Sequence, residues 1–394
     1  MHSRWQHVLD PELSTASIWS SNTNLPVDEP KREVEVVVLG DGFVGLSAAL
    51  ALAAHGKDVC VVRCTDEAAV LDEAGLGLID PPEQDDHANL TAALPIALSL
   101  DRPLFLAAAS SARFHALAQR HATQGGRSDT LVDAARQWEV MGSAYYRGGL
   151  IASRGGALDV GSTLSQLASA LAKARVPRAA ALRVLEKHGD RWALQLDGVA
   201  FVATTLLVTA PVRAVVPSSL ADQVIPRTVP SHNLVTEPLP RELAVTLSPQ
   251  CTPVREVSRC AYESRLDPSG RRFMFREPVK LDRSSPQEGA VRLYRQMLAR
   301  WPQLRGVRIT HSWVGESWHL RRPHAAQDAG SVYHCWGSGC DAAGLIRLGA
   351  GAGHAVAAGR NPSLPPTESP ARKWLLPLAD TYRRWADGLE RRRH

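Results

Sequence analysis

The sequence predicts an α/β protein in which a domain built on a parallel sheet is interleaved with a second domain built on an antiparallel sheet. Two stretches support this prediction. Residues 34–63 run as strand, glycine turn, helix and strand in one short unit. Residues 225–285 alternate in polarity and carry several turn signals, which is typical of antiparallel strands. At 394 residues the chain is long enough for two domains with large cores.

The first stretch is a βαβ unit with a glycine fingerprint. Residues 34–39, VEVVVL, form an apolar and β-branched run that predicts a buried parallel strand. The turn GDGFVG that follows has the spacing G-x-G-x-x-G. Its glycines permit a tight turn, a close approach of the backbone to a diphosphate, and close packing of the helix on the strand. We therefore expect a dinucleotide to contact the start of the helix at Gly40, Gly42, Phe43, Val44 and Gly45.

The second strand of this unit, residues 59–62, ends in an unusual residue. Such strands normally end in Asp or Glu, which binds the ribose hydroxyls, and here the position is Arg63. Three interpretations remain open: Arg63 binds a 2′-phosphate as in NADP sites, a dinucleotide binds without that hydrogen bond, or the site no longer binds one. Asp66 and Glu67 lie close downstream and can substitute through a longer loop.

Composition excludes several classes of protein. Much of the small basic excess, net charge +5, lies in the last dozen residues, and no interleaving of basic and aromatic residues is present, so we expect no nucleic-acid partner. The first thirty residues lack the zones of a signal peptide. The most apolar stretch, residues 199–216, is interrupted by Pro211 and Arg213 and is too short for a membrane span. We expect a cytoplasmic protein.

The cysteines show no metal-binding pattern. They form no C-x-x-C pair and have no histidines at zinc spacing, which predicts reduced, buried thiols and no metal. They are Cys60, Cys64, Cys251, Cys260, Cys335 and Cys340.

Further elements follow along the chain. We expect a helix over 94–124, a helix capped by Asp159 or Ser162, and a β-meander over 181–209 whose last strand returns beside the first one. Residues 267–270, DPSG, predict a hairpin, followed by a helix over 290–301 and a strand over 307–313. Residues 331–360 repeat the order strand, glycine-rich turn and helix.

With these elements in place, the sequence resembles the D-amino-acid oxidase superfamily of FAD-dependent oxidoreductases, nearest the D-amino-acid dehydrogenase and γ-glutamylputrescine oxidase branch. The resemblance covers nearly the whole chain. It is carried by SIW, VVVLGDGFVGLSAALALAAHG, YYRGGL with RGGALDV, LVTEPLP, YESRLDPSGR, WPQLRGVRITHSWVG and the glycine-rich block from Gly337. It implies a Rossmann-like, two-dinucleotide-binding FAD domain with an interleaved antiparallel-sheet substrate domain. It also implies oxidation of the C–N bond of an amine or amino acid, with hydride transfer to the flavin and hydrolysis of the imine product.

The resemblance divides the chain into discontinuous domains. We assign residues 1–33 to an N-terminal arm, and residues 34–90, 145–220 and 331–394 to the FAD-binding domain. The remaining residues, 91–144 and 221–330, form the substrate or cap domain.

The resemblance also assigns site residues. Leu182 lies in the strand that resembles the adenine-binding segment, and Gly337, Gly339, Cys340 and Asp341 lie where the flavin ring is expected. Tyr262 matches an aromatic residue of the substrate domain, His311 beside Trp313 is a candidate proton acceptor, and Arg321 with Arg322 can pair with a carboxylate. Structural roles remain alternatives for these residues: a half-buried sheet residue at Tyr262, a core histidine at His311, a solvated loop at the arginines, helix-packing glycines, and a buried thiol at Cys340.

Four departures from the family pattern fall at the expected cofactor site. They are Arg63, the loop DEAGLGLI in place of ASGRNGG, Arg276 with Glu277 in place of two glycines, and Cys340 with Asp341 in place of a small turn that bears a histidine. Each replaces a close approach or a hydrogen bond with bulk or charge, which predicts weakened FAD binding.

Two other functions therefore stay open beside an FAD-dependent oxidoreductase that acts on a small amine or amino acid. One is a catalytically silent homologue that serves as a partner subunit of a heteromeric oxidase. The other is a protein that binds a reduced nicotinamide cofactor. The sequence also leaves open a homo- or hetero-oligomeric state.

Overall fold

In a computed structural model of the protein, the described residues form two large sheets, each with its own helices, and one small two-stranded sheet. The structure describes residues 7–19, 33–63, 75–79, 102–123, 128–174, 176, 178–179, 182–196, 200–209, 228–257, 261–277, 285–318, 324–327, 331–336 and 342–362. One sheet is parallel at its centre and the other is mainly antiparallel. This arrangement confirms the predicted α/β class.

The first sheet has eight strands, with β2 at its centre. Six strands follow one another in the order β10 (Leu182–His188), β11 (Arg191–Leu196), β12 (Ala200–Val208), β2 (Glu33–Leu39), β3 (Val59–Val62) and β9 (Arg178–Ala179). The other two form a branch, in which β19 (Val332–Trp336) pairs with both β12 and β18 (His324–Gln327). Val38 of β2 pairs in parallel with Leu207 on one side and with Val61 on the other. The predicted return of the meander beside the first strand is thus confirmed.

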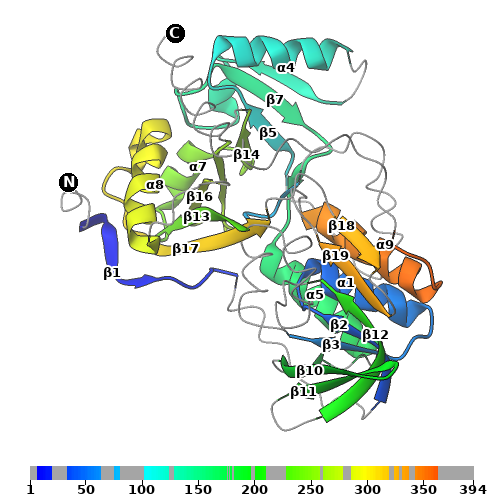
Figure 1. Ribbon diagram of the computed structural model, residues 1–394. Coiled ribbons are helices and arrows are strands. Elements are labelled where there is room, and N and C mark those ends of the chain that lie inside the picture. The colour runs from blue at the N-terminus through cyan, green and yellow to red at the C-terminus, as the bar shows by residue number, and fades with distance from the viewer. Residues whose placement is uncertain are drawn as a thin grey trace, which may run out of the picture.

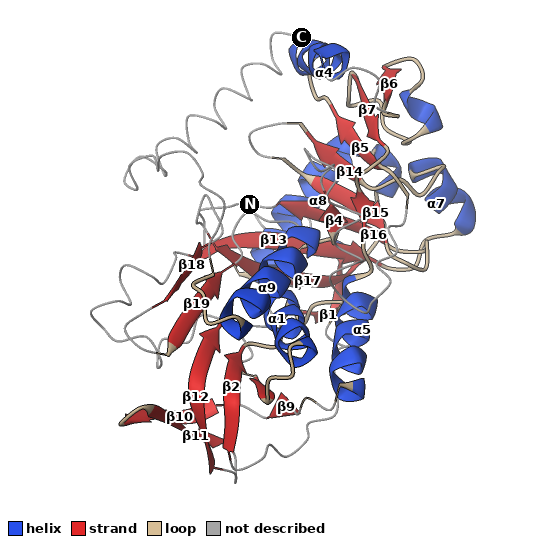
Figure 2. Cartoon of the chain, turned by 90° about the vertical axis from the view of Figure 1, so that its right-hand side faces the viewer, coloured by secondary structure: helices blue, strands red, loops and turns tan. Residues whose placement is uncertain are grey.

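Three helices accompany this sheet, α1 (Phe43–Ala54), α5 (Val160–Lys173) and α9 (Ala342–Ala357), and they lie side by side in Figure 2. Helix α1 is buried along most of its length because it contacts both α5 and α9. Asp159 caps α5, since its carboxylate accepts a hydrogen bond of 3.0 Å from the backbone N–H of Ser162, as predicted.

The second sheet has nine strands. Their order is β1 (Leu9–Ser14), β17 (Ile309–Trp318), β13 (Thr228–Thr236), β16 (Phe273–Glu277), β15 (Glu263–Leu266), β14 (Val254–Glu256), β5 (Leu104–Ala107), β7 (Gly148–Ala152) and β6 (Thr130–Asp133). The arm that precedes β2 therefore contributes an edge strand, paired in parallel with β17 (Figure 1). A separate two-stranded sheet joins β4 (Leu78–Ile79) to β8 (Gly156–Ala157).

The predicted hairpin at residues 267–270 is confirmed between β15 and β16. One carboxylate oxygen of Asp267 accepts hydrogen bonds from the backbone N–H groups of Arg271 and Arg272, at 2.8 and 2.9 Å. Asp267 thereby satisfies two donors in the turn, which is a common reason for finding Asp there.

The prediction of one helix over residues 94–124 is wrong in part. Strand β5 occupies Leu104–Ala107, and helix α4 begins only at Ser111 and ends at Thr123. A four-residue apolar run such as LFLA fits a buried strand as well as a buried helix, so periodicity cannot separate the two. Strand β7 also differs from expectation, because it pairs in the nine-stranded sheet although we assigned residues 145–220 to the other domain.

The other helices among the described residues are α7 (Arg241–Leu247), α8 (Pro286–Arg300) and the short 3-10 helices η3 (Gln137–Glu139) and η4 (Pro302–Leu304). Helix α8 begins four residues before the predicted helix over 290–301. Ser285 and Glu288 form a capping box that fixes the earlier start.

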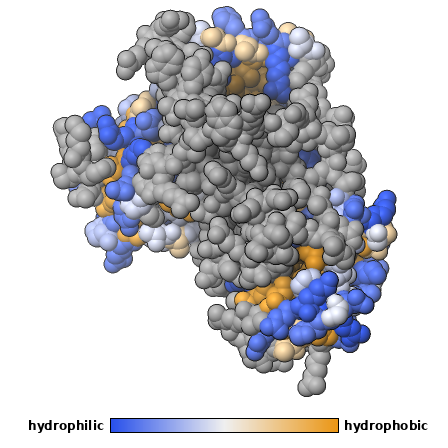
Figure 3. Space-filling view, viewed as in Figure 1, coloured by the Kyte–Doolittle hydropathy of each residue, from blue (hydrophilic) through white to orange (hydrophobic). Residues whose placement is uncertain are grey.

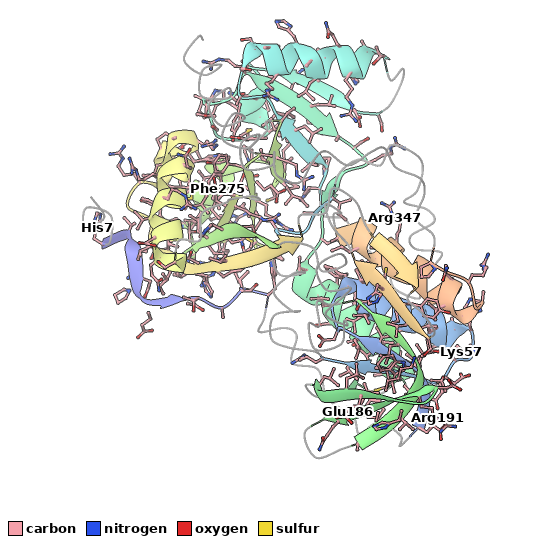
Figure 4. All side chains as sticks on the ribbon, viewed as in Figure 1. His7, Lys57, Glu186, Arg191, Phe275 and Arg347 are labelled. Atoms are coloured by element: carbon pink, nitrogen blue, oxygen red, sulfur yellow. The ribbon has the colours of Figure 1, made fainter. Side chains whose placement is uncertain are left out.

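The two sheets meet through a shared hydrophobic core. Trp19, Val38 and Leu76 pack in this core together with Met274 and Trp313 of the nine-stranded sheet. A second core lies between the other face of that sheet and α8, and Phe275 belongs to it (Figure 4). Trp19 is buried and donates from its indole N–H to the carbonyl of Gly75, so it packs against the body as expected.

On the face in view in Figure 3, the coloured residues include both hydrophilic and hydrophobic side chains. In the described part of the chain, no helix has the length and apolar character needed to cross a bilayer.

Candidate functional site at the glycine turn and the facing sheet

The glycine turn between β2 and α1 has the geometry that its sequence predicts. Gly40 has φ of 121°, a left-handed conformation that favours glycine. Its N–H donates to the carbonyl of Val62 on β3 at 2.9 Å. A Cβ atom at Gly45 would lie 1.9 Å from the carbonyl oxygen of Gly40, so only glycine fits there. The turn therefore brings the start of α1 directly against the carboxyl end of the parallel strands.

The start of α1 is suited to an anion. Its N-cap is Gly42, which has extended backbone and makes no side-chain capping bond. The first turn of a helix presents N–H groups and partial positive charge, which attract phosphate. Phe43 and Val44 are buried and belong to the shared core, so they position this helix end. This cradle fits the diphosphate of a dinucleotide.

Arg63 is held by the glycine turn itself. Its Nε lies 2.9 Å from a carboxylate oxygen of Asp41, the residue between the first two glycines of the fingerprint. The Asp41 side chain is 7% exposed and the Arg63 side chain 34%. The carbonyl of Arg63 accepts a hydrogen bond of 3.2 Å from the N–H of Leu182, which places the start of β10 next to the end of β3.

Helix α9 packs on α1 through glycines. A Cβ atom at Gly349 would lie 2.2 Å from the carbonyl of Val44, and one at Gly353 would lie 2.4 Å from the carbonyl of Ala48. The two helix backbones are therefore in close contact. The predicted flavin-ring residues Gly337, Gly339, Cys340 and Asp341 precede α9 and lie outside the described residues.

One face of the nine-stranded sheet is directed toward the glycine turn. Val235 and Met274, which pair across β13 and β16, share the core that contains Phe43. Residues that pair directly across antiparallel strands project from the same face, as do residues two apart in a strand. By this register the same face also carries Asn233, Arg255, Glu263, Arg265, Arg276, His311 and Trp313.

Three of these residues form a buried charged group, which we call the Arg–Glu–Arg group: Arg255, Glu263 and Arg276. Arg255 contacts one carboxylate oxygen of Glu263 at 3.0 Å, and Arg276 contacts the other at 2.9 Å. Their side chains are 18%, 6% and 12% exposed, respectively. Two guanidinium groups share one carboxylate, so the group carries one positive charge in excess.

The ionisation of Glu263 follows from this arrangement. Burial acts to raise the pKa of its carboxyl, but the charges and hydrogen bonds of Arg255 and Arg276 outweigh burial and lower that pKa below its ordinary value. Glu263 is therefore an anion at neutral pH. The Nε of Arg276 is buried and makes no hydrogen bond within the described residues, so a donor remains for a bound molecule.

Two arginines connect this face to the loop at residues 75–77 and to Leu158. Arg265 donates from one terminal nitrogen to the carbonyls of Leu76 and Leu158, at 3.0 and 2.8 Å. A terminal nitrogen of Arg276 lies 3.6 Å from where a Cβ atom at Gly75 would be placed. The loop at residues 75–77 thus lies directly against the charged face.

His311 lies on the same face, opposite Val235. Its Nδ1 is 3.0 Å from the hydroxyl of Thr310, which also accepts a hydrogen bond from Arg272. Burial and the nearby charge of Arg272 lower the pKa of His311, which favours the neutral imidazole at pH 7. Trp313, two residues along the strand, is buried in the shared core.

Tyr262 lies on the opposite face of the sheet, in the second core. Its ring stacks on Phe275 with centroids 5.3 Å apart, and the guanidinium carbon of Arg300 lies 4.1 Å from its ring centroid. Arg300 is fully buried and pairs with Glu256, to which Tyr146 donates a hydrogen bond. The structural alternative of a packed sheet residue therefore describes Tyr262. Arg321 lies outside the described residues.

The described thiols and acids form no metal centre. Cys60 and Cys335 are buried, and burial, followed by the charge of Asp58, raises the pKa of Cys60 to about 12. Cys251 is exposed, in contrast to the expectation of buried thiols. Across the described ranges, no three His, Cys, Asp or Glu side chains come together as metal ligands.

Comparison with protein families identifies the chain. A model described as "FAD dependent oxidoreductase" matches residues 85–359, and one described as "FAD binding domain" matches residues 35–97. The chain belongs to this family of FAD dependent oxidoreductases. The resemblance predicted from the sequence motifs is thereby confirmed. No curated protein sequence matches the oxidoreductase.

Solved structures share the fold of the oxidoreductase at low sequence identity. Glycine oxidase from Bacillus cereus ATCC 14579 has a TM-score of 0.64 and 12% identity, over 83% of this chain and 98% of that one. L-proline dehydrogenase from P. horikoshii has a TM-score of 0.64 and 13% identity, over 84% and 93%. L-amino acid deaminase from Proteus vulgaris has a TM-score of 0.63 and 15% identity, over 91% and 98%. These similarities establish the fold, with an FAD-binding domain and a mixed substrate sheet.

Sequence reasoning missed the Arg–Glu–Arg group as a unit. We treated Arg276 and Glu277 only as lost glycines, whereas Glu277 lies on the other face and pairs with Arg292 at 3.2 Å. A signal was present in the predicted hairpin, where charged residues alternate as Glu263 and Arg265 on a strand with buried neighbours. Alternating charges on a buried strand indicate a polar inner face.

Proposed function

We propose that this FAD-dependent oxidoreductase oxidises the C–N bond of an amino acid. The observation that supports the proposal is the Arg–Glu–Arg group with its excess positive charge, on the sheet face directed toward the dinucleotide turn. FAD bound there supplies the acceptor for the hydride. The relatives of known structure are described as acting on amino acids or related amines, including glycine, L-proline and iminodiacetate.

The charged group suits a carboxylate substrate. Arginine recognises carboxylates with paired, charge-assisted hydrogen bonds. Arg276 reaches the loop at residue 75, and its buried Nε retains a donor within the described residues. A bound carboxylate would neutralise the excess charge, so binding is favoured by electrostatics at a site with little water.

His311 is our candidate for the group that accepts a proton from the substrate's ammonium group. An amine gives up hydride only as the neutral species, so the ammonium group must first lose a proton. Because the pKa of His311 is lowered, its imidazole is ready to accept one at neutral pH. Nδ1 faces the Thr310 hydroxyl, which can accept its N–H, so in this tautomer Nε2 is the atom that accepts the substrate's proton.

The test adds single compounds to FAD-loaded protein without oxygen and follows reduction of the flavin. The compounds are a panel of amino acids and, for each, the amine that lacks its carboxylate. We expect amino acids to bleach the flavin absorbance and the amines to do so poorly. Replacing Arg276 by Met should lower the efficiency with amino acids by about tenfold to a hundredfold, the usual effect of losing a hydrogen bond to a charged group, and change the efficiency with amines little.

The same experiment tests the second function. The family pattern has glycine at position 276, whereas here the Arg276 side chain lies against the loop at residue 75. Bulk and charge at a position of close approach favour a silent homologue that acts as a partner subunit. Protein that takes up FAD but shows no bleaching with any member of the panel would contradict the enzyme proposal and support that alternative.

A further inference from the structure

The Asp41–Arg63 ion pair occupies the part of the turn where a dinucleotide carries its charge. Leu39 of β2 and Val62 of β3 pair directly, so the two strands end at the same level. Arg63 follows Val62, and Asp41 lies one residue before Gly42, the N-cap of α1. In open α/β sheets the ligand binds outside the carboxyl ends of the strands, at this level.

The charges of this pair are the reverse of the usual arrangement. A typical site has an acid at the end of the second strand, where it binds the ribose, and the glycine turn meets the diphosphate. Here the second strand ends in a cation, and the turn carries the acid. A carboxylate next to the start of α1 occupies the same favourable potential as a diphosphate and repels it. The guanidinium 2.9 Å from Asp41 offsets that repulsion.

We propose that Asp41 and Arg63 act as a charge balance that sets the affinity of the turn for the diphosphate of FAD. The inference rests on the proposed binding of FAD at this turn. Asp41 opposes the diphosphate and Arg63 compensates, so affinity follows the summed charge of the two side chains. Arg63 in the balanced pair does not act as a free cation for a 2′-phosphate, which argues against NADPH as the preferred ligand.

The test measures FAD affinity by quenching of flavin fluorescence in Asp41→Asn, Arg63→Gln and the double variant. A change of one unit charge beside the diphosphate, in a partly screened site, changes affinity by about tenfold. We expect Asp41→Asn to bind FAD about tenfold more tightly and Arg63→Gln about tenfold more weakly. The double variant should return to within about threefold of the wild type, and Arg63→Lys should retain most of the affinity.

The chain offers a matched control at the opposite end of the same sheet. Arg191 pairs with Glu33 at 2.7 Å, and Figure 4 shows Arg191 on the strands remote from the second sheet. Arg191→Gln should leave FAD affinity unchanged. Equal changes in this control and in Arg63→Gln would show a general charge effect and overturn the inference.

The sign of the effect of Asp41→Asn separates a charge balance from a merely structural ion pair. A structural pair predicts that both single variants bind FAD more weakly, and that result would overturn the proposal, as would unchanged affinity in both. A wild type that fails to bind FAD while Asp41→Asn binds it would support the charge balance and contradict the proposed enzyme. Failure of binding in every variant would contradict both.

Discussion

Glu263 is the residue on which the charged face of the substrate sheet depends. It is a buried anion between two guanidinium groups, and removal of its charge would take from both cations the carboxylate that they share. We expect Glu263→Gln to lower the free energy of unfolding by about 3–5 kcal/mol, as measured when one partner of a buried ion pair is removed. Urea denaturation at neutral pH measures this difference.

The pH dependence of that difference follows from the lowered pKa of Glu263. The pKa is lower in the folded chain than its ordinary value of 4.5, so the stabilisation is complete above that value. It is lost as the pH falls through the folded pKa. The difference between wild type and Glu263→Gln should therefore shrink below about pH 4.5. A matched control is Glu139→Gln at the exposed Arg136–Glu139 pair, which should change stability little. An equal loss of unfolding free energy in Glu263→Gln and Glu139→Gln would contradict the burial of the Arg–Glu–Arg group.

At the scale of elements, the contact between α1 and α9 is decided by single glycines. A Cβ atom at Gly353 would lie 2.4 Å from a carbonyl of α1, whereas one at Gly351 meets no atom within 4 Å. We expect Gly353→Ala to lower the free energy of unfolding by about 1–3 kcal/mol because the helices must separate. Gly351→Ala should raise it by about 0.5–1 kcal/mol, since alanine is the better helix former.

Thermal or urea unfolding of the two variants checks this prediction with the same chemical change at neighbouring positions. Destabilisation by both substitutions, or by neither, would show that the helices do not pack as described.

Several elements could be predicted because a local rule determines them. The glycine turn at residues 40–45, the cap at Asp159 and the hairpin at residues 267–270 each follow from backbone conformations or hydrogen bonds within a few residues. Strand β5 could not, because four apolar residues fit either type of element. Strand β1 also escaped prediction, since LDPELS shows no strict alternation and contains a proline.

At the scale of the whole molecule, the sequence resemblance predicted the family and the two-sheet fold, but the candidate substrate face required the register between strands. Arg255, Glu263 and Arg276 come together only because β14, β15 and β16 are neighbours in a fixed alignment. The same alignment sends Tyr262 to the opposite face, where it packs beside Arg300. A shift of one residue would exchange the two faces.

The central claim is that the glycine turn before α1 holds FAD, and retention of flavin tests it most directly. Gly42 has a φ of −84°, which any residue can adopt, so Gly42→Leu should fold while its side chain blocks the approach of the diphosphate. Wild type and variant are equilibrated with FAD, desalted and compared by flavin absorbance, with melting temperature as the check on folding. The account predicts retained flavin in the wild type and none in Gly42→Leu, with equal melting temperatures when both proteins are compared before FAD is added. Equal flavin in both proteins, or no flavin in the wild type, would contradict it.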